Sequence, residues 1–407
     1  MKTQQAMKNK GNKQKNIVSN IQTPLQLYPI RIIPVDIGYK IDSKKQQLIF
    51  EMMSTSGMKV QNGVRLFGED AILGIECSDR LNFYVFADGV GVFSYQDDCV
   101  EFASVNELNA ENVLTERKNA HRSILNHNHL ISDKIDEIVE AMRSLVKTKK
   151  RRRTSLTSWE SKGLSYVMSF YLLNAERNMI DNPKVQEWLG NLLFTDKHTY
   201  FGSVSDCFEQ EKREQIMKNV DVLNDIHVCH SWATMVAIGN LPAEHRDYYI
   251  ELEVVLQHIW MYAYITEQNI DMFLAESDKK VSSQQLTDFY DTLIDMTLIV
   301  KKYDTIISST VHERELRIFE ALKESSKLEV LKKGIDDKSQ ILESKLSWAV
   351  DQKRLKSDRN TELFITVLTI LEVLSGFGLG INDLSKPYIW VSIAACLILF
   401  VMYRMRD

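Results

Sequence analysis

Apolar residues are spread unevenly along the 407-residue chain and gather in two runs near its C-terminus. The first run, residues 363–381, reads LFITVLTILEVLSGFGLGI and carries a single charged residue, Glu372. The second run, residues 388–403, reads YIWVSIAACLILFVMY and carries none. A helix needs roughly 20 apolar residues to cross the ~30 Å hydrocarbon layer of a bilayer. The two runs therefore predict a pair of transmembrane helices, with a buried hairpin of core helices as the alternative.

Basic residues flank this predicted hairpin on both sides and indicate its orientation. The loop between the two runs contains only Lys386, which is offset by Asp383. By the positive-inside rule the loop then faces outward, and both chain ends lie in the cytoplasm. The basic residues on the two flanks are Lys353, Arg354, Lys356, Arg359, Arg404 and Arg406.

Small and polar residues recur every three or four positions along the first predicted span. At 100° per residue they form one stripe of about 120° on a helix. A carboxylate within the bilayer costs a few kcal/mol unless it faces protein or water. Glu372 is therefore expected to line a pore built by several copies, whereas close helix packing is the alternative for the threonines and glycines. The stripe comprises Glu362, Thr366, Thr369, Glu372, Gly376 and Gly380.

A proline-free stretch, residues 312–374, leads into the first span. Its leucines and isoleucines recur at coiled-coil-like spacing among dense lysines and glutamates, which predicts a helical stalk. Gly334, with two aspartates close behind it, is the one weak point of this pattern, so the stretch is either a continuous rod or a helix bent there. Two further helices are expected upstream, at residues 243–276 and 283–308.

The N-terminal half contains short apolar runs separated by polar or glycine breaks, a pattern typical of β-strands. Asp88-Gly89 predicts a hairpin turn within one of these runs. Helices are expected at residues 126–147 and 185–194. The pattern predicts an α+β fold whose N-terminal part is a mixed α/β domain. The runs expected to form strands are residues 25–37, 46–53, 64–76, 81–95, 165–173 and 225–239.

These patterns divide the chain into four parts. They are a flexible basic tail (1–20), an α/β domain (21–240), a helical stalk (241–360) and a transmembrane hairpin (361–407). A net charge of -5 argues against direct nucleic-acid binding, which usually needs a strongly basic surface. The five cysteines show no CxxC spacing, so we expect reduced thiols and neither a disulfide framework nor a zinc site.

Positive charge is concentrated in KTKKRRR, residues 147–153, where six of seven residues are basic. Arginine side chains match the geometry of phosphate groups, so the run predicts a phosphate-binding site. A solvated loop or a contact that stabilises an oligomer is the alternative.

Two histidines and a cysteine lie close together in the strand predicted at residues 225–239. His227 and Cys229 should face one side of that strand and His230 the other, which is the arrangement of structural residues and not of a metal site. The sequence contains no P-loop, GxSxG or HExxH motif and no recognisable pair of nucleophile and base. We therefore expect that the protein is not an enzyme.

The order of these parts resembles the CorA-like family of divalent-cation channels, in which the first span ends in Gly-Met-Asn. Here Gly380-Ile381-Asn382 stands at the equivalent place, with isoleucine in place of methionine. The resemblance implies a homopentamer in the cell inner membrane whose first spans line the pore. Asn382 and the backbone of Gly380 would meet a hydrated cation such as Mg²⁺, which gives up its water reluctantly.

A CorA-like channel with a cytosolic anion site is similar to the membrane effectors associated with type III CRISPR systems. That resemblance implies a nucleotide second messenger, an S-adenosylmethionine–AMP conjugate, that binds the α/β domain and changes the channel in antiviral defence. No covalently bound cofactor is expected. Two alternatives stay open: a constitutive CorA-like Mg²⁺ channel gated by the metal, and a non-conducting membrane-anchored scaffold. The residues implied in ligand binding are Lys150, Arg151, Arg152, Arg153, Trp159, Tyr166 and Trp232.

Overall fold

The computed structural model describes eleven parts of the chain, and its residues form two compact units. The units are Met1–Ser339 and Gln340–Asp407, and the boundary between them falls within one long helix, α9. The described residues are 25–66, 70–108, 129–146, 168–193, 217–221, 226–231, 234–240, 243–276, 294, 313–326 and 328–376.

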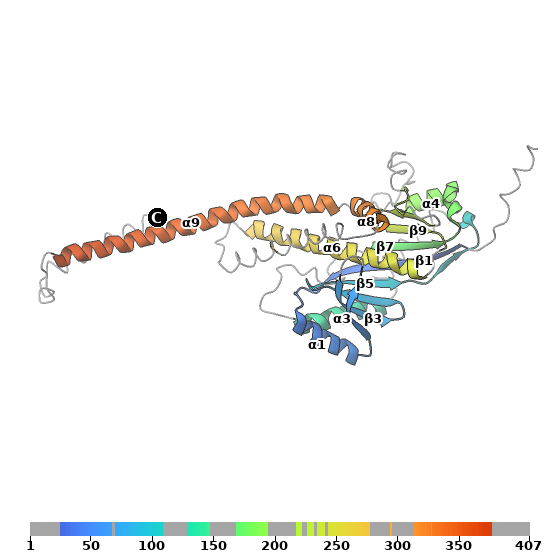
Figure 1. Ribbon diagram of the computed structural model, residues 1–407, viewed down its shortest axis with the longest axis horizontal. Helices are drawn as coiled ribbons and strands as arrows, with labels where there is room; N and C mark the ends of the chain where they lie inside the picture. The colour runs from blue at the N-terminus through green and yellow to red at the C-terminus, as the bar shows by residue number, and fades with distance from the viewer. Residues whose placement is uncertain are drawn as a thin grey trace, which may run out of the picture. The chain divides into compact units, whose positions relative to one another are not determined.

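A mixed β-sheet organises the first unit (Figure 1). In the described residues it has nine strands, in the order β2-β3-β4-β5-β1-β7-β9-β8, with β6 pairing β1. Among these strand pairs only β7 and β9 run parallel. The strands are β1 (Leu25–Asp36), β2 (Lys59–Arg65), β3 (Asp70–Ser78), β4 (Leu81–Val85), β5 (Val90–Gln96), β6 (Val100–Phe102), β7 (Met168–Asn174), β8 (His227–His230) and β9 (Thr234–Ile238).

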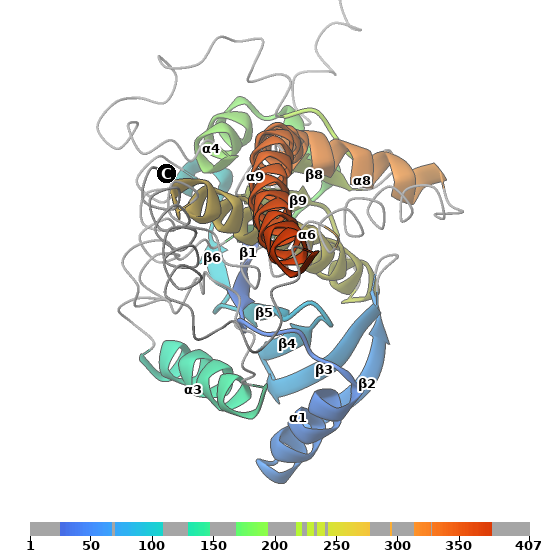
Figure 2. The same cartoon turned by 90° about the vertical axis from the view of Figure 1, so that its left-hand side faces the viewer.

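Helices cover both faces of this sheet, and Figure 2 shows α6 on one side and α1 and α3 on the other. The central strand β1 is therefore buried on both faces, and most residues of its sequence LQLYPIRIIPVD are apolar. The helices are α1 (Ser43–Thr55), α3 (His129–Val146), α4 (Pro183–Leu193), α6 (Ala243–Glu276), α8 (Glu313–Ser325) and α9 (Leu328–Gly376). Two 3₁₀ helices, η1 (Val105–Glu107) and η2 (Arg177–Asp181), complete the described elements.

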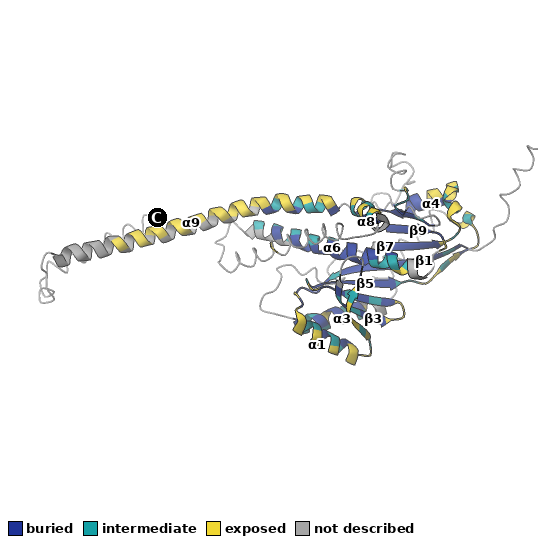
Figure 3. Cartoon of the chain, viewed as in Figure 1, coloured by how far each residue is buried: buried dark blue, intermediate teal, exposed yellow. Residues whose placement is uncertain are grey.

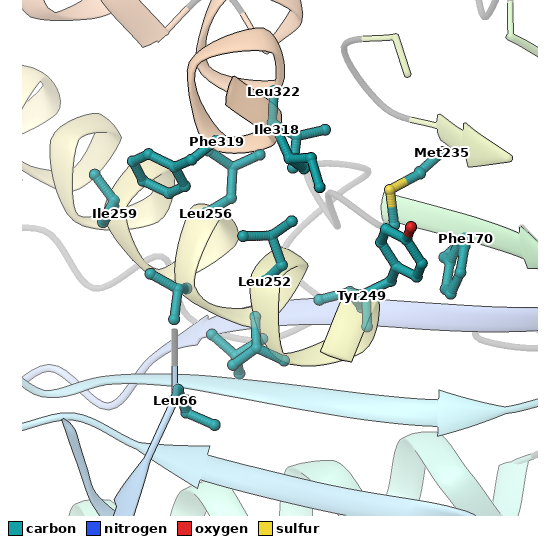
Figure 4. Packing of buried hydrophobic residues seen from close by; sticks show 14 of the residues in the cluster. Leu66, Phe170, Met235, Tyr249, Leu252, Leu256, Ile259, Ile318, Phe319 and Leu322 are labelled. Carbon is teal, nitrogen blue, oxygen red and sulfur yellow. The ribbon is translucent and has the colours of Figure 1, made fainter. Parts of the chain in front are cut away.

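Side chains on alternate positions of the central strand β1 enter different cores. Ile30 and Ile32 of β1 pack with α6 and α8, and Figure 4 shows this core around Leu252. Leu27, from the opposite face of β1, packs with Trp188 of α4. The core under α1 and α3 is a third cluster, built around stacked rings of Phe83 and Phe93.

Residues 46–53 form the middle of helix α1, so the prediction of a strand there is wrong. The helix starts because the Oδ1 atom of Asp42 accepts a hydrogen bond from the backbone N–H of Lys45 at 2.9 Å. Ile49 and Met53, four residues apart, are then buried on one side of the helix. Gln, Glu and Met are also good helix formers.

Most other predicted elements of the first unit are confirmed. The Asp88-Gly89 turn joins β4 to β5, and Gly89 has a φ of 87°. Helix α6 has the predicted bounds, α3 lies within its own, and α4 begins at Pro183, two residues before its predicted start. Where the sequence predicted one strand at 225–239, the described residues form two antiparallel strands, β8 and β9.

Of the two alternatives for the stalk at Gly334, the structure has the continuous helix, because α9 runs through this residue without interruption. The break lies instead at Ser326, between α8 and α9. Packing explains the unbroken helix: Ile335 is buried, and the Nζ atom of Lys338 lies 2.8 Å from carboxylates of Glu267 and Asp271 on α6. The helix predicted at 283–308 lies outside the described residues apart from residue 294.

The second unit is described only over residues 340–376, all within α9. The side chains that are described along this part of the helix are exposed (Figure 3). Across the described helices, none combines the length and the apolar character needed to cross a bilayer. The second predicted span and residues 377–381 of the first lie outside the described residues.

Candidate functional site

The residues predicted to bind ligand all lie outside the described part of the chain. They are Lys150, Arg151, Arg152, Arg153, Trp159, Tyr166 and Trp232. Of the predicted pore residues, Gly380 and Asn382 also lie outside it, whereas Thr366, Thr369 and Glu372 belong to α9. The described residues therefore offer a site that the sequence did not predict.

That site is an open cleft of about 730 Å³ beside η2. Three segments form it: the η2 turn that follows β7, helix α4, and the first residue of β8 with Met217 beside it. Its volume falls within the range of small-molecule pockets, roughly 300–1,000 Å³. The lining residues are Glu176, Arg177, Asn178, Ile180, Asp181, Gln186, Met217 and His227.

The cleft lies at the carboxyl edge of the parallel pair β7 and β9. Leu173 near the end of β7 pairs with Ile238, the last residue of β9, and Ile238 pairs in turn with His227. The chain leaves β7 directly into η2, so the polar residues of η2 stand at this edge. Ligands in open α/β sheets commonly bind outside the carboxyl ends of parallel strands.

His227 is a half-buried member of the lining. Its Nε2 atom lies 2.9 Å from the carbonyl oxygen of Met217. A carbonyl only accepts, so Nε2 carries the hydrogen and Nδ1 is left as a possible acceptor. Burial holds the pKa of His227 below its ordinary value of 6.5, and the positive charge of Arg177 acts in the same direction against the opposing effects of Met217 and Asp181.

The rest of the lining mixes charges with amides and apolar groups. Arg177 supplies a guanidinium, and Glu176 and Asp181 supply carboxylates. The Nδ2 atom of Asn178 donates to Glu176 at 3.2 Å, which orients that carboxylate. This combination suits a small polar ligand that carries charges of both signs.

A short loop connects the wall of the cleft to helix α6. Asn219 accepts hydrogen bonds through Oδ1 from the backbone of Val228 at 2.8 Å and of Asp221 at 3.1 Å. Asp221 is fully buried and accepts a hydrogen bond from the hydroxyl of Tyr249 on α6. Met217 is therefore fixed beside β8 by the same network that fastens the loop to α6.

A second polar cluster lies at the other end of β8, where His230 faces α6 and α8. Its Nδ1 atom is hydrogen-bonded to the hydroxyl of Ser325, the last residue of α8. Its Nε2 atom lies 3.0 Å from Oε1 of Glu253 on α6, but the contact lacks the alignment of a hydrogen bond. Gln257 donates to the other oxygen of Glu253 at 3.3 Å. His227 and His230 thus face opposite sides of β8, as predicted.

Serine, histidine and glutamate together suggest a hydrolytic triad, but the geometry here does not support one. The side chains of His230 and Glu253 are almost completely buried, so no substrate reaches them. The Ser325 hydroxyl also bonds the helix carbonyl of Ala321 at 2.8 Å. The cluster therefore joins β8, α6 and the end of α8. Within the described residues no group of three or more His, Cys, Asp and Glu side chains could hold a metal ion.

Comparisons of the chain with models of known protein families, with curated proteins and with solved structures find no match.

The sequence did contain a signal for the cleft. The polar run AERNMIDNP, residues 175–183, follows the apolar strand β7 directly. A polar turn at the end of a buried strand is where binding residues are often positioned. His227 could not be joined to that run from the sequence, because the pairing of β7, β9 and β8 brings them together.

Proposed function

We propose that this protein is a ligand-gated membrane effector of the CorA type. A nucleotide second messenger of the S-adenosylmethionine–AMP type binds the α/β domain, and the first spans of several copies line a pore for a divalent cation such as Mg²⁺. In this proposal the protein acts in type III CRISPR antiviral defence by disturbing the membrane or its ion balance.

The continuity of α9 carries this proposal. The helix begins with Leu328, which is buried in the core formed with α6 and α8. It then continues unbroken to Gly376 and so includes residues 363–376 of the first apolar run. The same helix thus contains buried residues of the first unit and residues of the predicted span, and in this proposal it carries the gating change from one to the other.

A pore also requires several copies, because two spans per chain cannot enclose one. The exposed part of α9 favours assembly, since Ile341, Trp348 and Leu355 recur at intervals of seven residues. Side chains spaced by seven lie on nearly the same side of a helix, as in coiled coils.

The test is cation flux into liposomes that contain the full chain, with and without the conjugate. We expect flux that depends on the conjugate, and we expect Glu372→Gln or Asn382→Ala to reduce it while conjugate binding is retained. Glu343→Gln, at an exposed glutamate of α9 that lies outside both the predicted span and the stripe, is the matched control for Glu372→Gln.

Three other outcomes would contradict the proposal in different ways. Flux that responds to Mg²⁺ and ignores the conjugate would favour the metal-gated channel. An absence of flux under both conditions would favour the membrane-anchored scaffold. Normal gating in both pore variants would place the conduction path elsewhere.

A further inference from the structure

We propose that the cleft beside η2 is the ligand site, and that it takes a nucleotide conjugate carrying one phosphate and one cationic group. The location rests on the geometry of the cleft, and the identity of the ligand rests on the proposed function. The basic run at residues 147–153 is then not the principal binding site.

The charges of the lining define the chemistry of the ligand. Arg177 is the guanidinium of the lining, and its paired N–H groups match two oxygens of a phosphate. Glu176 and Asp181 would repel a polyphosphate but would attract an ammonium or sulfonium group. A ligand that bears a single phosphate together with a positive group satisfies both.

Uncharged groups in the same cleft suit a heterocyclic base. Ile180 and Met217 supply apolar surface for the faces of a ring, and the Gln186 amide supplies a donor and an acceptor for its edge. His227 adds a further acceptor through Nδ1, because its Nε2–H is used by Met217. The volume of about 730 Å³ is sufficient for a ligand of nucleotide size.

Strand β8 connects this cleft with the junction of α8 and α9. His227 lies in the cleft, and His230, three residues on, bonds Ser325 at the end of α8. At ~3.4 Å per residue the two histidines are about 10 Å apart along the strand. A ligand that displaces His227 would therefore act on the helix break that precedes α9.

The test is equilibrium binding to the full chain in lipid nanodiscs. The probes are the S-adenosylmethionine–AMP conjugate, AMP and S-adenosylmethionine. We expect Arg177→Ala to weaken binding of the conjugate and of AMP by at least about tenfold, the loss of one charged hydrogen-bonded contact. Asp181→Asn should weaken binding of the conjugate and of S-adenosylmethionine and leave AMP unaffected.

Two controls accompany these variants. Lys184→Ala removes an exposed cation from α4 that bonds Asn106 and does not line the cleft, so it should bind like wild type. The double variant Arg152→Ala with Arg153→Ala tests the basic run and should change binding by less than Arg177→Ala. Because Arg177 and Asp181 are exposed, their replacement leaves the cores unchanged.

The outcomes separate this inference from the proposed function. Unchanged binding in both cleft variants, with loss in the Arg152/Arg153 variant, would overturn the cleft and leave gating intact. Binding that depends on Arg177 without any effect of the conjugate on flux would support the cleft and contradict gating. Failure of the wild-type protein to bind any of the three probes would overturn the cleft assignment and the nucleotide trigger together.

Discussion

At the tip of the β4–β5 hairpin, Gly89 has a φ of 87° and lies against the backbone of Tyr39. A Cβ atom at this position would be 2.1 Å from the carbonyl oxygen of Tyr39, a distance that only a backbone shift can relieve. Gly89→Ala should therefore lower the free energy of unfolding by about 3 kcal/mol, from left-handed strain and overpacking together. Thermal unfolding of the full chain in detergent measures this.

Gly63 provides the matched control, because it has a φ of 64° but no heavy atom within 4 Å of an added Cβ. Gly63→Ala should cost only the conformational strain, about 1 kcal/mol. Equal losses of stability in the two variants would show that the contact between Gly89 and Tyr39 is not formed.

The pKa of His227 makes stability depend on pH. Burial disfavours the imidazolium, so the pKa in the folded chain lies below the ordinary 6.5 and the unfolded chain takes up the proton first. The contribution of His227 is therefore complete above pH 6.5 and is lost as the pH falls through the folded pKa. His227→Gln retains a donor for Met217 but cannot titrate, so we expect its melting temperature to fall less between pH 7 and acidic pH.

Titrating groups shared by both proteins cancel in this comparison, which isolates the imidazole at position 227. Melting temperatures that fall in parallel for wild type and His227→Gln would contradict the burial of the ring. A steeper fall in the melting temperature of the variant would show that folding raises the pKa of His227 instead of lowering it.

Among the helices and strands, those that depend on the local sequence pattern were predicted correctly. The β4–β5 hairpin follows from Asp88-Gly89, and α6 has the bounds that its pattern indicates. The strand predicted at 46–53 was wrong because the apolar residues there fit the repeat of a helix as well as the alternation of a strand. The N-cap at Asp42 favours the helix. The cleft could not be predicted as a unit, since Arg177 and His227 meet only through the strand order β7-β9-β8.

Gly334 shows how tertiary packing overrides a local preference for a break. It lies in the interior of α9, and a Cβ atom added there would meet only Glu267 Oε1, at an ordinary 3.6 Å. Gly334→Ala should therefore stabilise the protein by about 0.5–1 kcal/mol, because alanine favours helix and restricts the unfolded chain. The comparison is the melting temperature of the variant and of wild type in one detergent.

A loss of stability in Gly334→Ala would instead support a functional bend at this residue. Flux measured on the same variant adds a second criterion, since a hinge used in gating would alter the response to the conjugate. With a continuous helix we expect that response to be retained.

For the whole molecule, the exposed apolar side chains of α9 need a partner if the proposal of a pore is right. Ile341, Trp348 and Leu355 are 53%, 66% and 61% exposed. Single exposed apolar residues are common, but three large ones at intervals of seven on one helix favour a helix–helix interface. Second copies of the same chain meet this requirement, because each copy presents the same face.

Trp348→Glu places a charge in the middle of this face and should shift the full chain in detergent toward smaller species by mass measurement. Ser347→Glu introduces the same charge at an exposed neighbour about 100° around the helix, so it should leave the mass unchanged. Loss of the oligomer should also abolish conjugate-dependent flux, since one copy supplies only two predicted spans. An unchanged mass in Trp348→Glu, or a wild-type protein that is monomeric, would show that this face of α9 does not hold copies together.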